Sequence, residues 1–398
     1  MLRKTTLIIS LISLSTILTG WFLLAYSQPE EELAGEFAPG KFVSSEVCGA
    51  CHQDIYNIWS EHSIHAKAVT DPIFQAGYQQ AIQTHGEAIK TVCLSCHAPT
   101  TMVTKDYPLK TKLSREGVTC DFCHSVKAVE LKKAPSAPGE AVRSPFILDV
   151  GLVKRGPLAD AQPTIHEAAY SELHTTSLFC AGCHEYTNEK GGHVLSTYTE
   201  WKEGPYPARK FYCQTCHMPI FFGALVVDPV SQKLNRKLIN LHQVPGGHSL
   251  DQLKRALTVE IADIVRASDR MVVNIRVVNQ GAGHAVPTGL TTKKMILQVE
   301  AKPTDGGKSH HDERVYQRVL VNEKGEELKS EAEVFVEAKG VRRDTRLKPR
   351  ESRLEKFTFP ITPGTEVLVT AKLAYIATHG DYHPDEIREV YLMERISD

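Results

Sequence analysis

Three patterns of hydrophobic and polar residues divide the chain. An apolar run over residues 5–25 follows Arg3 and Lys4 and ends before an acidic stretch at residues 30–32. Residues 44–250 contain few strongly periodic apolar stretches, whereas apolar and polar residues alternate in short segments from about Arg255 onward. Because a period of two puts apolar side chains on one face of a strand, the last third of the chain is predicted to be all-β.

The alternating segments predict roughly seven short strands separated by turn residues. They cover residues 257–264, 271–278, 295–301, 315–321, 354–359, 366–375 and 390–393. This number of short strands favours an immunoglobulin-like sandwich over residues 255–398. The predicted fold class is therefore α+β and multidomain, with a mainly helical and loop-rich domain at residues 44–254 followed by an all-β domain.

The N-terminal run is typical of an export segment, with a positive flank, an apolar stretch and a polar exit. Ala25 and Ser27 are small residues at a suitable spacing for cleavage, but about 20 apolar residues are also long enough to span a bilayer. Residues 1–27 are therefore predicted to be a signal peptide or a membrane anchor, and residues 28–43 a linker. In both cases the remaining chain faces outward, in the periplasm or at the outer face of the cytoplasmic membrane.

Composition adds little beyond these limits. The chain has 398 residues, enough for two domains, and 42% of them are hydrophobic, so it is expected to be globular. Its 46 Lys and Arg residues nearly balance 47 Asp and Glu residues. This balance gives no indication of a nucleic-acid partner.

The cysteines carry the chemical signal, because all ten lie in five Cys-x-x-Cys-His motifs. With 18 histidines in 398 residues, five such matches by chance have a probability on the order of 10⁻⁷ under random placement. The motifs, in chain order, consist of Cys48, Cys51 and His52; Cys93, Cys96 and His97; Cys120, Cys123 and His124; Cys180, Cys183 and His184; and Cys213, Cys216 and His217.

This spacing matches the covalent attachment of haem c. Two thiols one turn apart reach the two vinyl groups of one haem, and the adjacent histidine is the proximal ligand of its iron. Zinc ribbons do not require a following histidine in every unit. Structural disulfides leave the histidines unexplained, and thioredoxin-like pairs do not come in fives. The motifs therefore predict five covalently bound haem c groups in residues 44–254.

Short intervals between motifs predict which haems lie close together. The intervals from Cys93 to Cys120 and from Cys180 to Cys213 leave little room for anything except another haem. The second and third motifs, and the fourth and fifth, are therefore expected to pack in pairs. Residues 131–160, rich in proline and glycine, are expected to form an extended surface connection.

The sixth iron ligands are predicted to be histidines, because only six methionines occur and one of them is Met1. A helix predicted from Pro163 carries His166 and His174 eight residues apart, on one face. His62 is the alternative to His65, and His166 is the alternative to His174. His310, His311, His379 and His383 are expected to have no ligand role. The candidate distal ligands are His65, His174, His242, His248 and His284.

Parts of the chain resemble a known group of proteins. Ser44-Ser-Glu-Val-Cys48, Ile55-Tyr-Asn-Ile-Trp59 and His65-Ala-Lys-Ala68 resemble the first-haem region of the multihaem cytochrome superfamily that includes the tetrahaem electron acceptor of hydroxylamine oxidoreductase. The segment from Thr199 to Pro219 resembles the region around a late haem in the same superfamily. Gly283-His284-Ala-Val-Pro287-Thr-Gly289 is similar to a loop in the immunoglobulin-like tail of larger multihaem cytochromes, and this resemblance implies that His284 is a distal ligand.

The haem motifs of this chain differ from those of the enzymes in the superfamily. Pentahaem nitrite reductases use Cys-x-x-Cys-Lys at the catalytic haem, whereas every motif here ends in histidine, and hydroxylamine oxidoreductases carry eight haems. We therefore expect an electron carrier rather than an enzyme, passing electrons from a quinol oxidase or periplasmic donor to a terminal reductase or extracellular acceptor. The alternative is a reductase of a small nitrogen, sulfur or oxyanion substrate at one open-site haem.

Overall fold

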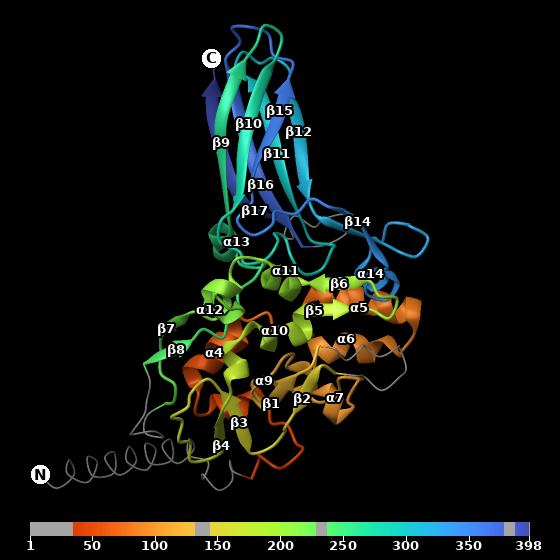
Figure 1. Ribbon diagram of the computed structural model, residues 1–398, viewed down its shortest axis with the longest axis vertical. Helices are drawn as coiled ribbons and strands as arrows, with labels where there is room; N and C mark the ends of the chain where they lie inside the picture. The colour runs from red at the N-terminus through yellow and green to blue at the C-terminus, as the bar shows by residue number, and fades with distance from the viewer. Residues whose placement is uncertain (1–34, 132–143, 228–236, 378–386, 398) are drawn as a thin grey trace, which may run out of the picture.

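The computed structural model describes residues 35–131, 144–227, 237–377 and 387–397. Figure 1 shows a helical, loop-rich first part at the bottom and an elongated β-structure standing on it at the top. The predicted export segment lies outside the described residues. Within the described residues, no helix is long and apolar enough to cross a membrane.

Short helices make up most of the first part. Several begin at side-chain caps: Asp71 Oδ1 accepts from the Phe74 N–H at 2.9 Å, and Thr119 Oγ1 accepts from the Phe122 N–H at 3.0 Å. The helices of this part are α3 (Ser45–Gly49), α4 (Gln53–His62), α5 (Pro72–His85), α6 (Ile89–His97), α7 (Thr101–Thr104), α8 (Lys112–Arg115), α9 (Cys120–Ser125), α10 (Ser177–His184), α11 (Thr197–Glu203), α12 (Cys213–His217) and α13 (Leu250–Ala256), with 3-10 turns η1 (Glu172–Thr175) and η2 (Pro207–Arg209).

Four two-stranded sheets connect these helices. They are β1 (Val126–Val129) with β2 (Phe146–Leu148), β3 (Val153–Gly156) with β4 (Glu167–Tyr170), β5 (Glu185–Thr187) with β6 (His193–Ser196), and β7 (Ile220–Phe222) with β8 (Leu238–Asn240). The β3–β4 pair is parallel and the other three are antiparallel. The apolar clusters of this part are small; the largest joins Phe42, Phe122, Val126, Val129 and Phe146.

The second part is a sandwich of two antiparallel sheets. One sheet has the order β15–β10–β9 and the other β12–β11–β16–β17. The strands are β9 (Leu257–Arg266), β10 (Met271–Asn279), β11 (Lys294–Pro303), β12 (His310–Tyr316), β15 (Ser352–Phe359), β16 (Val367–Ile376) and β17 (Ile387–Ser397). Alternate residues of β10 and β11 are buried, so both strands turn one face inward. Their buried side chains join one large core.

These strands confirm the two-sheet organisation expected from alternation, while the immunoglobulin-like assignment stays a prediction. One predicted strand, over residues 315–321, is wrong as a single element. The structure divides it at Gln317, because Tyr316 ends β12 in the sandwich and Arg318 begins β13 (Arg318–Val321), which pairs with β14 (Gly340–Asp344). His310 and His311 are the first two residues of β12.

The chain between β12 and β15 returns to the first part. It forms β13, α14 (Glu331–Glu337) and β14, with a capping box between Ser330 and Glu333 at the start of α14. Val334 and Leu320 pack there with Val194 of β6. Figure 1 shows α14 beside α5 and β6, where this excursion joins the two parts. The boundary between the predicted domains is therefore a packed interface.

Two local predictions in the first part are wrong. The segment after Pro163, predicted as a helix, forms β4 and η1, because Glu167–Tyr170 pairs in parallel with Val153–Gly156. Strand pairing over long range here outweighs the local helical pattern. Residues 131–160 are not simply an extended connection, since their described part contains β2 and β3.

Two leucines test the location of the sandwich core. Leu297 is fully buried in it, whereas Leu354 on β15 is 55% exposed. Leu297→Ala is expected to lower the free energy of unfolding by about 2–5 kcal/mol, because it removes buried methyl groups and leaves a cavity. Leu354→Ala is expected to change it by less than about 0.5 kcal/mol. Urea denaturation followed by far-ultraviolet circular dichroism measures both, and equal losses would contradict this core.

Candidate haem-binding site

Four of the five Cys-x-x-Cys-His motifs lie on short helices. The second and fourth motifs end α6 and α10, the third lies within α9, and the fifth forms α12. The first runs from the end of α3 to His52, which is the N-cap of α4. In these four motifs, helical geometry places the two thiols about one turn apart, with the histidine next to the second thiol.

None of the ten cysteines forms a disulfide, and some of their thiols lie close to thiols of other motifs. Thiols of different motifs lie close enough to shift each other's pKa. These pairs are Cys48 with Cys120 (first and third motifs), Cys96 with Cys183 (second and fourth) and Cys180 with Cys213 (fourth and fifth). The thiols of the fourth and fifth motifs thus lie close together, and those of the second and third motifs lie close to the fourth and the first. The predicted packing of haems in pairs stays a prediction.

Backbone carbonyls orient four of the five motif histidines. In each case Nδ1 lies within hydrogen-bonding distance of a carbonyl oxygen, which accepts only, so Nδ1 carries the proton and leaves Nε2 free as a ligand. The contacts are His52 with Leu225 (2.7 Å), His97 with Ala68 (2.9 Å), His124 with Arg155 (2.5 Å) and His217 with Pro245 (2.6 Å).

Four motif histidines face a second imidazole at a nearly constant spacing. Two metal–nitrogen bonds of about 2 Å plus the half-widths of two rings give a centroid separation of about 6 Å. The spacing therefore matches one iron between each two rings. The ring centroids are 6.3 Å apart for His52 and His166, 6.3 Å for His65 and His184, 6.5 Å for His124 and His242, and 6.3 Å for His217 and His284.

Three of the four second histidines are also oriented by a hydrogen bond from Nδ1 to a backbone carbonyl. Nδ1 of His166, His242 and His284 donates to the carbonyl of Glu167, Asn240 and Ala285 at 2.9, 2.7 and 2.9 Å. Burial lowers the pKa of His65, His217 and His242 to about 4 in each case. These imidazoles are therefore neutral at physiological pH, which is the form that binds a metal.

His65 is held by close backbone contact instead of by a helix. The predicted helix α4 ends at His62, three residues earlier, and the His65 carbonyl accepts from the Val118 N–H at 2.9 Å. Gly117, at φ +73°, lies so near that a Cβ there would be 2.3 Å from that carbonyl oxygen. A glycine is therefore required beside His65. The alternative His62 has a side chain that is 59% exposed, near Glu61.

His174, a predicted distal ligand, and its alternative His166 lie near different motif histidines. His174 lies 5.8 Å from His124, but its Nε2 is 3.1 Å from the Cys123 carbonyl and its buried Nδ1 has no partner. His242 faces the same motif histidine with Nε2 free. His166, the alternative to His174, faces His52, because β4 separates it from His174.

The second motif has a different environment. The Phe74 ring stacks on His97, with centroids 3.9 Å apart and an interplanar angle of 14°. In the described part of the chain, no histidine ring pairs with His97 at the spacing of the other four. The predicted ligand His248 has a buried Nε2 without a partner, and its pKa is lowered by burial and by the positive charges of Arg388 and Lys293.

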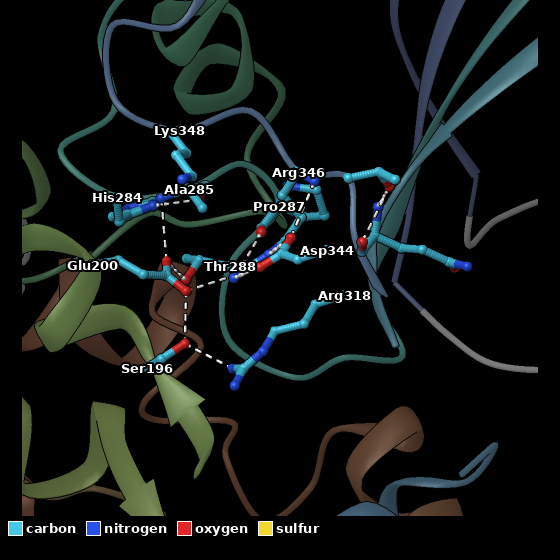
Figure 2. A network of polar contacts seen from close by, with 12 residues as sticks. Ser196, Glu200, His284, Ala285, Pro287, Thr288, Arg318, Asp344, Arg346 and Lys348 are labelled. Atoms are coloured by element: carbon cyan, nitrogen blue, oxygen red, sulfur yellow. Dashed lines mark hydrogen bonds and ion pairs between the residues drawn. The ribbon is translucent and has the colours of Figure 1, made fainter. Parts of the chain in front are cut away.

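A polar network at the domain boundary was not expected from the sequence. Figure 2 shows Glu200 of α11 between the loop that carries His284 and the side chains of Arg346 and Ser196. Glu200 accepts from Arg346 Nη1 at 2.7 Å, and Arg346 also contacts Asp344. Acidic and basic residues are common throughout the chain, so the sequence gives no signal for this network. Only the folded structure brings Glu200, Arg346 and Asp344 together.

The residues present fit the haem groups that the motifs imply. Pairs of thiols without disulfides and facing imidazole rings at a spacing suited to one iron coincide at four motifs. The fifth set, at His97, has the thiols and the oriented proximal imidazole. The chain thus holds the donor sets needed for covalent attachment and axial ligation.

Comparisons with known proteins agree with this chemistry. Residues 47–125 match the family model of cytochrome c554 and c-prime. The crystal structure of a penta-heme cytochrome c552 from Thermochromatium tepidum has a TM-score of 0.71 and 23% sequence identity, over 90% of this chain and 100% of that chain. That likeness shows a shared fold. A search of curated proteins finds no match.

Other solved structures match only weakly. A beta-glucosidase from Kluyveromyces marxianus has a TM-score of 0.17 and 13% identity, over 36% of this chain and 14% of that chain. A putative beta-galactosidase from Bacteroides fragilis has a TM-score of 0.18 and 12% identity, over 43% and 21%. At these TM-scores neither structure supports a shared fold with this chain. The matched family model, the shared fold and the five Cys-x-x-Cys-His motifs support one identification, that of a multihaem c-type cytochrome.

Proposed function

We propose that this protein is a pentahaem electron carrier in which at least four irons are held by two histidines each. The observation that carries the proposal is the spacing of 6.3–6.5 Å between four motif histidines and four others. The proposed distal ligands are His166 for the first motif, His242 for the third, His65 for the fourth and His284 for the fifth.

Electron transfer suits such ligation. A haem iron between two imidazoles changes oxidation state at low potential while keeping both axial ligands. The protein contributes rings whose orientation is fixed before any electron arrives, because seven of them donate Nδ1–H to a backbone carbonyl. Axial ligands that are fixed in this way favour electron transfer over replacement of a ligand by a substrate.

Contacts between motifs support passage of electrons along the chain of cofactors. The thiol contacts link the first motif to the third, and the fourth to both the second and the fifth. The predicted export segment supports a location in the periplasm or at the outer face of the cytoplasmic membrane. The proposed partners are a quinol oxidase or periplasmic donor and a terminal reductase or extracellular acceptor.

A second candidate function is reduction of a small nitrogen, sulfur or oxyanion compound at the second motif. It is favoured by the environment of His97, which faces no second imidazole in the described residues, and by the cationic groups near His248. Arg388 and Lys293 would attract an anionic substrate to this region. Electron transfer through the other four sites is common to both functions.

The number of attached haems tests the reading of the motifs. A pyridine haemochrome assay is expected to give five haems per chain for the wild type. Replacing both thiols of one motif, in Cys213→Ser with Cys216→Ser, is expected to give four. Ser95→Ala, which lies between two thiols and leaves both in place, should keep five. A wild-type value below five would contradict attachment at every motif.

Two histidines distinguish ligation of the first motif. His166→Ala is expected to convert one haem from low spin to high spin, because it removes the ring opposite His52. His62→Ala is the matched control, since this histidine is exposed and should leave the spectrum unchanged. Electron paramagnetic resonance of the oxidised protein measures both. A new high-spin signal in the His62 variant alone would reverse the assignment.

The second motif is expected to hold an open iron. The oxidised wild type should then contain one high-spin haem, and His248→Ala should leave the high-spin content unchanged. Adding nitrite or sulfite to the reduced protein tests the reductase: reoxidation with turnover supports it, and its absence leaves the carrier. If the wild type is entirely low spin and His248→Ala gains one high-spin haem, His248 is the sixth ligand and the open-site function is rejected.

A further inference from the structure

The Glu200 carboxylate joins the two domains through four contacts (Figure 2). Its Oε1 accepts from Arg346 Nη1 at 2.7 Å and from Ser196 Oγ at 2.7 Å. Its Oε2 accepts from Thr288 Oγ1 at 2.8 Å and from the Ala285 N–H at 3.2 Å. Glu200 and Ser196 belong to the first domain and the other three partners to the second, so one carboxylate fixes their relative position.

The Ala285 peptide units link this carboxylate directly to His284. The Ala285 N–H points to Glu200, while the Ala285 carbonyl accepts from Nδ1 of the His284 ring at 2.9 Å. Asn279 Nδ2 donates to the His284 carbonyl at 2.9 Å. A shift of Glu200 therefore moves the residue that orients the imidazole.

The rest of the loop leaves little freedom for compensation. A Cβ at Gly281 would lie 2.1 Å from the Arg255 carbonyl oxygen, so the loop lies directly against the end of α13. Glycine is the residue that permits this approach. Tyr206 also donates from its hydroxyl to the Gly281 carbonyl, at 3.3 Å. The start of the loop is anchored by packing and its end by Glu200.

Arg346 holds the other side of the carboxylate. It is only 8% exposed, and Asp344 accepts from Nε and Nη2 at 2.9 and 2.7 Å in a bidentate arrangement. Arg346 Nη1 also lies 3.3 Å from the Pro287 carbonyl of the same loop. Arg318, equally buried, donates to Ser196 Oγ at 2.8 Å. Charge-assisted contacts of this kind are short and directional, so the carboxylate has one preferred orientation.

We propose that Glu200 is the positioning residue that holds His284 in place as the distal ligand at the fifth motif, across the domain boundary. The inference rests on the proposed ligation at that motif, where the His284 and His217 rings are 6.3 Å apart. The second domain thus supplies an axial ligand whose orientation is set by a carboxylate of the first domain. Groups one step removed from the metal commonly orient its ligands in this way.

Glu200→Gln tests the proposal in the intact protein. The glutamine amide keeps one acceptor oxygen but turns an NH₂ group toward donors, which breaks two of the four contacts and removes the charge opposite Arg346. The expected result is a gain in high-spin ferric signal of up to one haem in five, by electron paramagnetic resonance. Carbon monoxide binding to the reduced protein should rise by the same amount, because one iron loses its sixth ligand.

Glu337→Gln is the matched control. Glu337 also forms an ion pair across the boundary, with Lys190, but it contacts no residue of the 281–288 loop in the structure. It should leave the spin state unchanged. A high-spin gain in both variants would show that loosening the boundary in general releases the ligand, and it would overturn a specific role for Glu200.

His284→Ala distinguishes ligation by His284 from positioning by Glu200. If His284→Ala gains one high-spin haem over the wild type and Glu200→Gln gains none, Glu200 has no positioning role, while the proposed ligation stands. If His284→Ala itself gains no high-spin haem, the ligation at the fifth motif is wrong and the inference falls with it. In the double variant, Glu200→Gln should add nothing to the effect of His284→Ala, because both act on one ligand.

A milder variant covers the case in which Glu200→Gln does not accumulate as a holoprotein. Thr288→Val removes one hydrogen bond to Glu200 and another to Thr197 while leaving the Arg346 ion pair in place. It is expected to show a smaller high-spin gain with five haems still attached. No increase in high-spin content over the wild type in this variant would reject the proposal.

Discussion

Imidazole rings in this protein are oriented by hydrogen bonds from Nδ1 to backbone carbonyls, and the arrangement of the first domain depends on these contacts. Each bond fixes the tautomer and the direction of Nε2 together. The bond from His52 reaches Leu225, 173 residues later in the chain, and that of His217 reaches Pro245 in the turn after β8. Orienting the rings therefore also brings distant segments of the chain together.

The two domains obtain their stability in different ways. The sandwich has one continuous core to which both sheets contribute, including Ile275, Leu297 and Phe357. The first domain has several small clusters separated by the motifs, so much of its interior is assigned to the cofactors that the motifs bind. Binding of a metal group commonly supplies folding free energy where the apolar core is small.

The domain boundary combines both kinds of interaction. The β13–α14–β14 excursion buries Val334 and Leu320 against Val194, which is ordinary apolar packing. The Glu200–Arg346 pair lies beside it with side chains 13% and 7% exposed. Removal of one partner from such a buried pair commonly costs about 3–5 kcal/mol, because the other charge is left without compensation. A boundary of this kind favours one relative position of the domains.

The sequence by itself predicted the attachment points, the division into two domains and most of the strands, because each of these is a local pattern. A Cys-x-x-Cys-His motif needs five residues, and alternation is visible within one strand. Tertiary structure decided which imidazole faces which motif. His166 faces His52 only because β4 pairs with β3, where the local pattern predicted a helix. Glu200 gained its role through contacts with Ala285 and Arg346, which lie far from it in the chain and join it only after both domains have folded.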